Sequence, residues 1–224
     1  MGVQITFLGH AGLSITDGTH TLVIDPFLTG NPIAVHKPEE IQCDYLALTH
    51  GHGDHMGDAV DILKANSATA IAAFEICEYF GEEGIEKCEP GNPGGRIYTD
   101  FGYVAFTPAF HSSSYNGRYM GQPTGLIINM GGVKIYHSGD TALFSDMKLI
   151  GEIAQPDIAF ICAGDRFTMG PRLAAVAAEY VHPKIAVPIH WGTFDLLTSD
   201  LTDFTPRGVE VKVMQPGDVL THGA

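Results

Sequence analysis

A polar loop punctuated by glycines begins where an apolar strand pattern ends, and this junction limits the folds and functions open to the chain. Residues 45–49 form a near-continuous apolar run, which is typical of a strand buried on both faces. The six residues that follow, 50–55, contain three histidines and one aspartate, and the intervening glycines permit a tight backbone path. Because an α/β sheet opens its site at strand ends, the loop predicts a metal site with the ligands His50, His52, Asp54 and His55.

Strand and helix patterns alternate along the chain and predict an α/β fold. Strands are expected at residues 3–8, 13–16, 21–24, 45–49, 69–73, 103–108, 125–128, 133–136, 158–162 and 185–189. Helices are expected at residues 58–66, 143–153 and 172–181. Residues 88–99 are rich in proline and glycine and are interpreted as turns.

The second half of the chain repeats the order of the first. In each half a hairpin ends in an aspartate, which is Asp25 in the first half and Asp140 in the second. Two similar halves that each pair a sheet with helices predict a four-layer αββα sandwich. No stretch has the composition of a linker, so we expect a single domain over residues 1–224, with halves of about 1–115 and 116–224.

The balance of charge argues against large anionic partners. The sequence has 26 acidic and 12 basic residues, a formal net charge of −14 at pH 7, and no run of lysine or arginine. Such a surface repels phosphate backbones and anionic lipid headgroups. We therefore expect neither nucleic acid nor a membrane as a partner.

The cysteines and the N-terminus bear on the compartment. The four cysteines are scattered and form no CxxC pair, which is typical of small buried side chains in a reducing compartment. The N-terminus has no basic region and no apolar stretch long enough for a signal peptide or a membrane span. These features predict a cytoplasmic protein.

The loop motif and four further segments together resemble the metallo-β-lactamase superfamily, over nearly the whole chain. These segments are THGHGDHMGD at 49–58, AFHS at 109–112, YHSGDT at 136–141, GDRFTMGP at 164–171 and IHWGTF at 189–194. They are similar in particular to the subfamily of metal-dependent hydrolases related to ascorbate-phosphate lactonase.

The resemblance implies two divalent metal ions per chain. The implied ligands are His50, His52 and His111 for the first ion, Asp54, His55 and His190 for the second, and Asp140 as a bridge between both. Nitrogen and oxygen ligands without a thiolate suit zinc, manganese or iron. Zn²⁺ is the first choice, with Mn²⁺ or Fe²⁺ as alternatives.

The implied reaction is metal-assisted hydrolysis, in which a metal-bound hydroxide cleaves a small ester, lactone, amide or phosphoester. Asp54 and His190 are the implied catalytic residues, and Asp54 can both bind a metal and orient the hydroxide. A small-molecule substrate would meet the loops around the metal pair.

The chemistry of the chain adds further candidates. His10 and Asp25 would support the metal ligands, since a ligating imidazole usually donates its other N–H to a carboxylate or carbonyl, although Asp25 also suits a turn. Arg118 and Arg166 would orient an anionic substrate, or else be solvated surface residues. His137 has no preferred role, because strand alternation equally places it at the sheet surface.

Two other activities stay open. A metal-dependent nuclease or phosphodiesterase acting on RNA uses a similar loop motif, although the charge of −14 and the lack of an appended RNA-binding segment argue against it. An iron-dependent redox enzyme of the same fold is the other, although the diiron branch has a carboxylate where this chain has His52. A homo-oligomer is compatible with the sequence.

Overall fold

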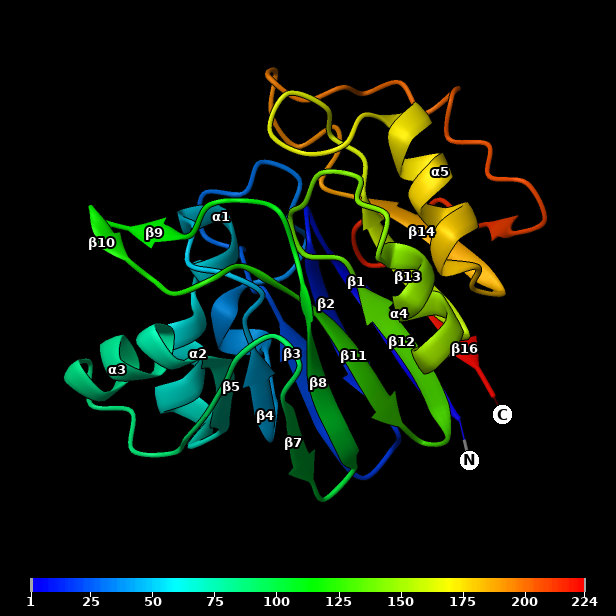
Figure 1. Ribbon diagram of the computed structural model, residues 1–224. Helices are drawn as coiled ribbons and strands as arrows, with labels where there is room; N and C mark the ends of the chain where they lie inside the picture. Colours follow the sequence, from blue (N-terminus) through cyan, green and yellow to red (C-terminus); the bar gives the residue numbers. More distant parts are fainter. Residues whose placement is uncertain (1, 224) are drawn as a thin grey trace.

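The central strands of this chain are apolar on both faces, because they lie between the other sheet and a layer of helices. The computed structural model describes residues 2–223. In the strand β13 (Ile158–Cys162), Ile158 and Phe160 pack between the sheets, whereas Ala159 and Ile161 pack beneath helices. Figure 1 shows the two sheets face to face with helices outside both, and the predicted αββα sandwich is confirmed.

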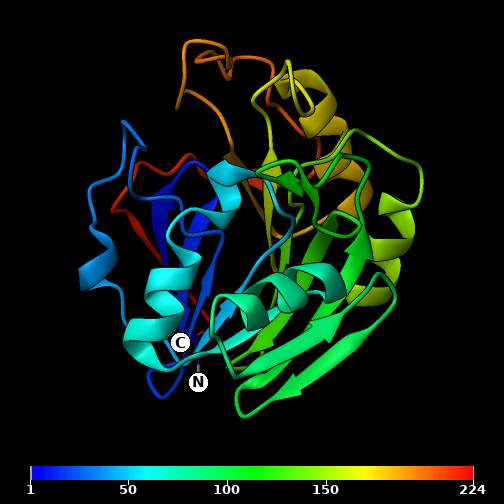
Figure 2. The same ribbon diagram turned by 90° about the vertical axis from the view of Figure 1, so that its left-hand side faces the viewer.

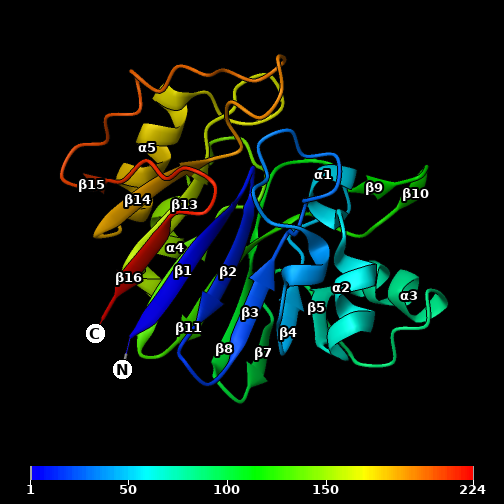
Figure 3. The same cartoon turned by 180° about the vertical axis from the view of Figure 1, so that it is seen from behind.

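The first sheet contains the strand that leads into the motif loop. Its seven strands are, in spatial order, β16 (Val219–His222), β1 (Val3–Gly9), β2 (Gly12–Thr16), β3 (Thr21–Ile24), β4 (Tyr45–Ala47), β5 (Thr69–Ala73) and β6 (Cys88–Gly91). Neighbours from β16 to β3 pair antiparallel, and neighbours from β3 to β6 pair parallel. Figure 3 shows β16 and β1, which come from opposite ends of the chain, side by side.

The second sheet has the same pattern of strand directions. Its seven strands are β7 (Arg96–Thr99), β8 (Gly102–Pro108), β11 (Thr124–Met130), β12 (Val133–His137), β13, β14 (Ile185–Ile189) and β15 (Glu210–Val211). Neighbours from β7 to β12 pair antiparallel, and neighbours from β12 to β15 pair parallel. A short hairpin of β9 (Ser114–Tyr115) and β10 (Arg118–Tyr119) stands apart from both sheets.

Each of the two sheets contains strands from both halves of the chain. β7 and β8 precede residue 115 but lie in the second sheet, and β16 follows it but lies in the first. The single domain and its division at about residue 115 stay predictions, since strand pairing does not follow that boundary.

Two pairs of helices cover the outer faces of the sheets. The helices α2 (Ala59–Asn66) and α3 (Phe74–Glu82) pack on the first sheet, and α4 (Met147–Ala154) and α5 (Pro171–Val181) pack on the second (Figures 1 and 2). The motif loop contains the single turn α1 (Gly53–Met56), and Pro38–Glu40 forms a 3₁₀ turn. Within residues 2–223, no helix is both long and apolar enough to cross a membrane, and the cytoplasmic location stays a prediction.

Several sequence-based expectations differ from the structure. Residues 88–99 were expected to form turns, yet they contain β6 and β7, because β5 and β8 supply pairing partners on either side. The helix expected at 143–153 begins only at Met147, because Leu143 and Phe144 pack against the core of the second sheet ahead of the helix. Cys43, Cys77 and Cys162 are buried as expected, but Cys88 is only half-buried; all four are free thiols.

The strand directions bring six chain segments to one edge of the sandwich. In the first sheet β1, β3 and β4 run in the same direction, as β8, β12 and β14 do in the second. The loops that follow these strands gather at the upper end of the molecule in Figure 1. Every residue predicted to bind a metal lies in one of these loops.

Candidate metal centre

Three imidazoles converge on one point in the first part of the site. His50 and His52 come from the loop after β4, and His111 comes from the loop after β8. His52 Nδ1 lies 3.0 Å from His50 Nε2 and 3.2 Å from His111 Nε2. Zn–N bonds of roughly 2.0–2.1 Å in a tetrahedron separate nitrogens by about 3.3 Å, so these three atoms are spaced as ligands of one ion.

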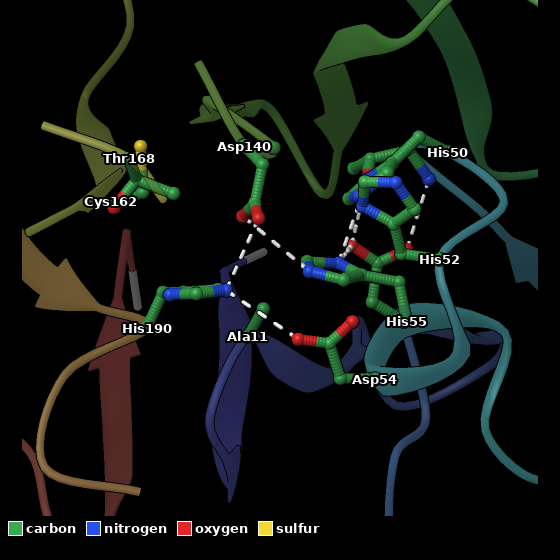
Figure 4. A network of polar contacts seen from close by, with 12 residues as sticks. Ala11, His50, His52, Asp54, His55, Asp140, Cys162, Thr168 and His190 are labelled. Atoms are coloured by element: carbon green, nitrogen blue, oxygen red, sulfur yellow. Dashed lines mark hydrogen bonds and ion pairs between the residues drawn. The ribbon is translucent and has the colours of Figure 1, made fainter. Parts of the chain in front are cut away.

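A second group lies beside the first and contains a carboxylate. The ligand atoms of His10, Asp54, His55 and His190 all lie within 4.8 Å of one another. Asp54 and His55 belong to the single turn α1, and His190 directly follows β14. Figure 4 shows Asp54 and His55 from one side and His190 from the other pointing toward a shared space.

Asp140 lies between the two groups. One carboxylate oxygen, Oδ2, is 3.5 Å from His111 Nε2 and 3.1 Å from His190 Nε2, whereas Oδ1 is 3.4 Å from His55 Nε2. Its side chain is 3% exposed, so solvent does not hydrate this charge. The carboxylate therefore reaches both groups, which is the placement that a bridging ligand requires.

Several buried polar atoms in this space have no hydrogen-bond partner among the described residues. They include His55 Nε2, Asp140 Oδ1 and His190 Nε2. An unpaired buried polar atom costs about 1–3 kcal/mol, so a cluster of three is explained best by a ligand that all of them bind. Imidazole and carboxylate donors of this kind fit a divalent cation.

Burial sets the protonation of the first group. Burial lowers the pKa of His50 well below its usual value, and the neighbouring charge of His55 lowers it further. Burial also lowers the pKa of His52 and of His111. All three side chains are thus neutral imidazoles near pH 7, the form that binds a metal ion.

Ion pairing sets the protonation of the second group. Burial opposes ionisation of Asp140, but the charges of His190 and His55 hold the pKa of its carboxyl well below the usual range. Asp140 in turn raises the pKa of His190 to about 9, although burial acts in the opposite direction. Burial opposes ionisation of Asp54 as well, and its contacts with His10 and His190 keep its pKa low. A divalent cation that binds here therefore displaces protons from imidazoles held next to ionised carboxylates.

Asp25 contacts the second group through His55, and its supporting role stays a prediction. It is fully buried, and its Oδ2 lies 2.8 Å from Nδ1 of His55, which leaves Nε2 of His55 facing the site. Thr49 donates to both oxygens of Asp25, from its backbone N–H at 2.9 Å and from its hydroxyl at 2.6 Å. Sequence reasoning missed Thr49, although its place directly before His50 was a signal. The carboxylate fixes the ring orientation of His55, which is the usual role of such a group beside a metal ligand.

Both ring nitrogens of His10 have polar partners, and one of these partners is Asp54. Nδ1 lies 2.9 Å from Oγ1 of Thr193, and Nε2 lies 3.1 Å from Oδ2 of Asp54. The ring is fully buried, and its centroid lies 4.0 Å from that of His190, with the two ring planes tilted by 45°. Burial and the charge of His190 lower the pKa of His10 to about 4. His10 thus holds Asp54 in place as a neutral imidazole, and it is also close enough to be a ligand itself.

The remaining candidates lie outside the ligand space. Arg118 is in β10, where its Nη1 lies 2.6 Å from Oε2 of Glu82. Arg166 is exposed, with its guanidinium 5.5 Å from the ring centre of Phe167. A substrate role for either arginine stays a prediction. His137 is fully buried rather than at the sheet surface: its Nε2 lies 2.9 Å from the Ala11 carbonyl, so it links the two sheets.

Asp25→Asn is expected to weaken metal binding by roughly 10–100-fold without unfolding the protein. An amide offers only one acceptor oxygen, so its NH₂ group must face a donor, either at Thr49 or at His55. The affinity is measured by competition with a chromogenic chelator. Asp157→Asn is the matched control, because Asp157 pairs with Lys184 far from this cluster. If folded Asp25→Asn protein binds metal with the wild-type affinity, Asp25 does not support the metal centre and is only a turn residue.

Comparisons with known proteins agree with this geometry. A family model described as a beta-lactamase superfamily domain matches residues 20–191. A UPF0173 metal-dependent hydrolase of Geobacillus sp. (strain WCH70) is 46% identical over 96% of this chain and 98% of its own length. Another, from Thermus thermophilus, is 45% identical over 97% of this chain and 98% of its own.

A solved structure shares the whole fold. Igni18, a metallo hydrolase from the hyperthermophilic archaeon Ignicoccus hospitalis, is 32% identical, with a TM-score of 0.90 over 100% of both chains. The loop motif, the paired sheets and these relatives all indicate the same family. The chain belongs to the metallo-β-lactamase superfamily and is a metal-dependent hydrolase.

Proposed function

We propose that this chain is a hydrolase with a dinuclear metal centre that cleaves a small ester, lactone, amide or phosphoester. The proposal rests chiefly on the position of Asp140, whose two oxygens face His111 and His190 on one side and His55 on the other. The ions would be held by His50, His52 and His111, by Asp54, His55 and His190, and by Asp140 between them. Zn²⁺ is the ion we expect first, and Mn²⁺ or Fe²⁺ would fit the same donors.

When bound, two divalent ions activate a water molecule near neutral pH and polarise the bond that it attacks. The residues of the chain supply the orientation. Asp54 is half-exposed at 31%, unlike the other members of its group, and therefore faces both the cluster and the solvent-open cleft. His10 holds one oxygen of Asp54, which leaves the other to accept a hydrogen bond from the attacking water.

The cleft above the cluster favours a small substrate. It has a volume of about 300 Å³ and is lined by His52, Asp54, His111, Ser112, Asp140, Phe167 and His190. This is the lower end of the volume range of small-molecule sites. No lysine or arginine is among those lining residues, and a polynucleotide needs many phosphate contacts.

The test is turnover of a panel of chromogenic esters, lactones and phosphodiesters beside structured RNA, under matched metal and salt. We expect turnover of at least one small substrate by protein with about two ions per chain, and no RNA cleavage. His52→Asn should lower that turnover at least about 100-fold, because it removes a ligand. His182→Asn is the matched control, since His182 is exposed at the end of α5 and Asn tolerates its left-handed backbone.

Two results would contradict the proposal. RNA cleavage without small-molecule turnover would favour a nuclease. Protein that binds two ions yet hydrolyses nothing in the panel would remove the hydrolytic assignment of this centre.

A further inference from the structure

A phenylalanine lies exposed at the mouth of the metal cleft. Phe167 is 52% exposed, yet it is the one large apolar side chain that lines the cleft together with the predicted ligands. Exposed apolar side chains at a cleft are typical of a contact that a ligand completes. Its position therefore bears on the kind of substrate that the site accepts.

The loop that presents Phe167 is held by its own backbone. Within residues 164–170, the N–H of Asp165 donates to the carbonyl of Met169 at 3.0 Å, and the N–H of Thr168 donates to the carbonyl of Asp165 at 2.9 Å. Asp165 and Arg166 are both left-handed, with φ of 63° and 39°. Two consecutive non-glycine residues in this region cost about 1–3 kcal/mol each. Strain of this kind persists where it aims a side chain, and here the side chain is Phe167.

The same loop is fixed to the metal centre. A Cβ atom at Gly164 would overlap the carbonyl oxygen of His190, so the loop begins in direct contact with the backbone of that residue. At the other side of the loop, Oγ1 of Thr168 accepts a hydrogen bond from the N–H of Gly164 at 3.3 Å, and Thr168 lies on the His190 side of the cluster (Figure 4). The backbone that carries Phe167 is thus positioned relative to His190.

Two other exposed phenylalanines lie in loops that also contain predicted ligands. Phe110 is 63% exposed and directly precedes His111. Phe194 is 37% exposed, and its ring centre lies 5.5 Å from that of His10. Three separate loops around the predicted metal centre therefore each present a partly exposed phenylalanine.

Charges in the cleft do not favour an anionic substituent. The carboxylates that line it, Asp54 and Asp140, are negative and would be matched by bound cations, and with those cations bound the imidazole of His190 would be neutral. Arg118 is paired with Glu82, and Arg166 lies against the ring of Phe167 without lining the cleft. A carboxylate or phosphate on the substrate, away from the scissile bond, has no cationic side chain to pair with there.

We propose that Phe167 contacts the substrate directly and that the substrate has an uncharged apolar group, preferably an aromatic ring, beside the bond that is cleaved. This inference rests on the proposed hydrolytic function and narrows it to neutral apolar esters or lactones. Phe167 takes no part in the covalent step: the oxygen of water bonds to the acyl carbon, the C–O bond breaks, and the leaving oxygen takes up a proton. The products are a carboxylic acid and an alcohol from an ester, or one hydroxy acid from a lactone, and Phe167 contributes binding of the apolar group.

The experiment compares Phe167→Ala with Phe74→Ala, a control that removes an equally exposed ring (50%) from α3. With phenyl acetate, we expect KM to rise about tenfold in Phe167→Ala while kcat changes little, because a ring contact is lost. With methyl acetate, KM should change less than about twofold, because no ring is bound. Phe167→Tyr should retain the wild-type KM, since it keeps the ring.

A binding measurement separates this inference from the hydrolytic function. Isothermal titration calorimetry with 4-phenyl-2-butanone, a neutral ketone that cannot be hydrolysed, should show affinity about tenfold lower in Phe167→Ala, whereas Phe74→Ala should match the wild type. Ester turnover by the wild type with no selective effect of Phe167→Ala on phenyl acetate or on the ketone would overturn the inference and leave the function standing. Selective loss of ketone binding without any ester turnover would contradict the function instead, and support the contact.

Discussion

Asp140→Ala is expected to release both metal ions and to lower turnover by on the order of 10³-fold or more. The two carboxylate oxygens lie 3.1–3.5 Å from Nε2 atoms of His55, His111 and His190, so one truncation removes a partner from both groups at once. It also leaves the buried His190 without the carboxylate that raises its pKa to about 9. Metal content is measured by elemental analysis after gel filtration, and turnover with the best substrate of the panel.

Asp146→Ala is the matched control for this prediction. Asp146 follows Asp140 in the same connection but is exposed, and its carboxylate accepts a hydrogen bond from the hydroxyl of Ser145. Its truncation should leave two ions and full activity. Loss of one ion from Asp140→Ala, with the other site fully occupied, would show that Asp140 binds a single metal and does not bridge.

Gly57→Ala is expected to destabilise the metal-free protein by about 3 kcal/mol or more. Gly57 ends the turn α1 with φ of 41° and ψ of −120°, a backbone conformation that other residues rarely adopt. A Cβ atom there would also overlap the carbonyl oxygen of Pro26, directly after Asp25. Relief of the overlap must separate the turn that contains Asp54 and His55 from the segment that supports it, so metal affinity should fall as well.

Gly53→Ala is the control for this substitution because it changes the same residue type in the same motif. Gly53 has ordinary helical surroundings, and no atom lies within 4 Å of a Cβ built there. Alanine should therefore be neutral or stabilise by up to about 1 kcal/mol. Urea unfolding of both variants in chelator gives the free energies. Equal free energies of unfolding for the two variants would show that the structure relieves the overlap between residue 57 and Pro26 with little loss of stability.

These two glycines also correct a detail of the sequence interpretation. The glycines of the motif were expected to permit a tight backbone path, without distinction between them. A Cβ at Gly51 would meet the side chain of Met120, and one at Gly57 would meet Pro26, but Gly53 faces open space. Which of them requires glycine depends on neighbours that come from distant parts of the chain.

Elements with a strong local pattern were predicted with accurate bounds. β5, β13 and β14 begin and end where the apolar runs do, because short apolar runs between turn residues leave few alternatives to a buried strand. α3 was missed because it follows β5 without a break, so that its inward stripe of Ile76, Cys77 and Phe80 continues the apolar run of the strand. β6 contains Pro90 and Gly91 and exists because β5 pairs with it.

The predicted ligands of the motif loop could be proposed from the sequence because their chemistry and local spacing are properties of the chain itself. His50, His52, Asp54 and His55 lie within six residues, and any compact path brings them close together. Their surroundings depend on which strand ends meet. His10 and Thr193 are 183 residues apart in the sequence, yet His10 Nδ1 lies 2.9 Å from Thr193 Oγ1. Arg118 forms an ion pair with Glu82, and Phe167 lines the metal cleft. Such contacts arise from the packing of one sheet on the other, because burial joins residues across the whole chain that no local pattern connects.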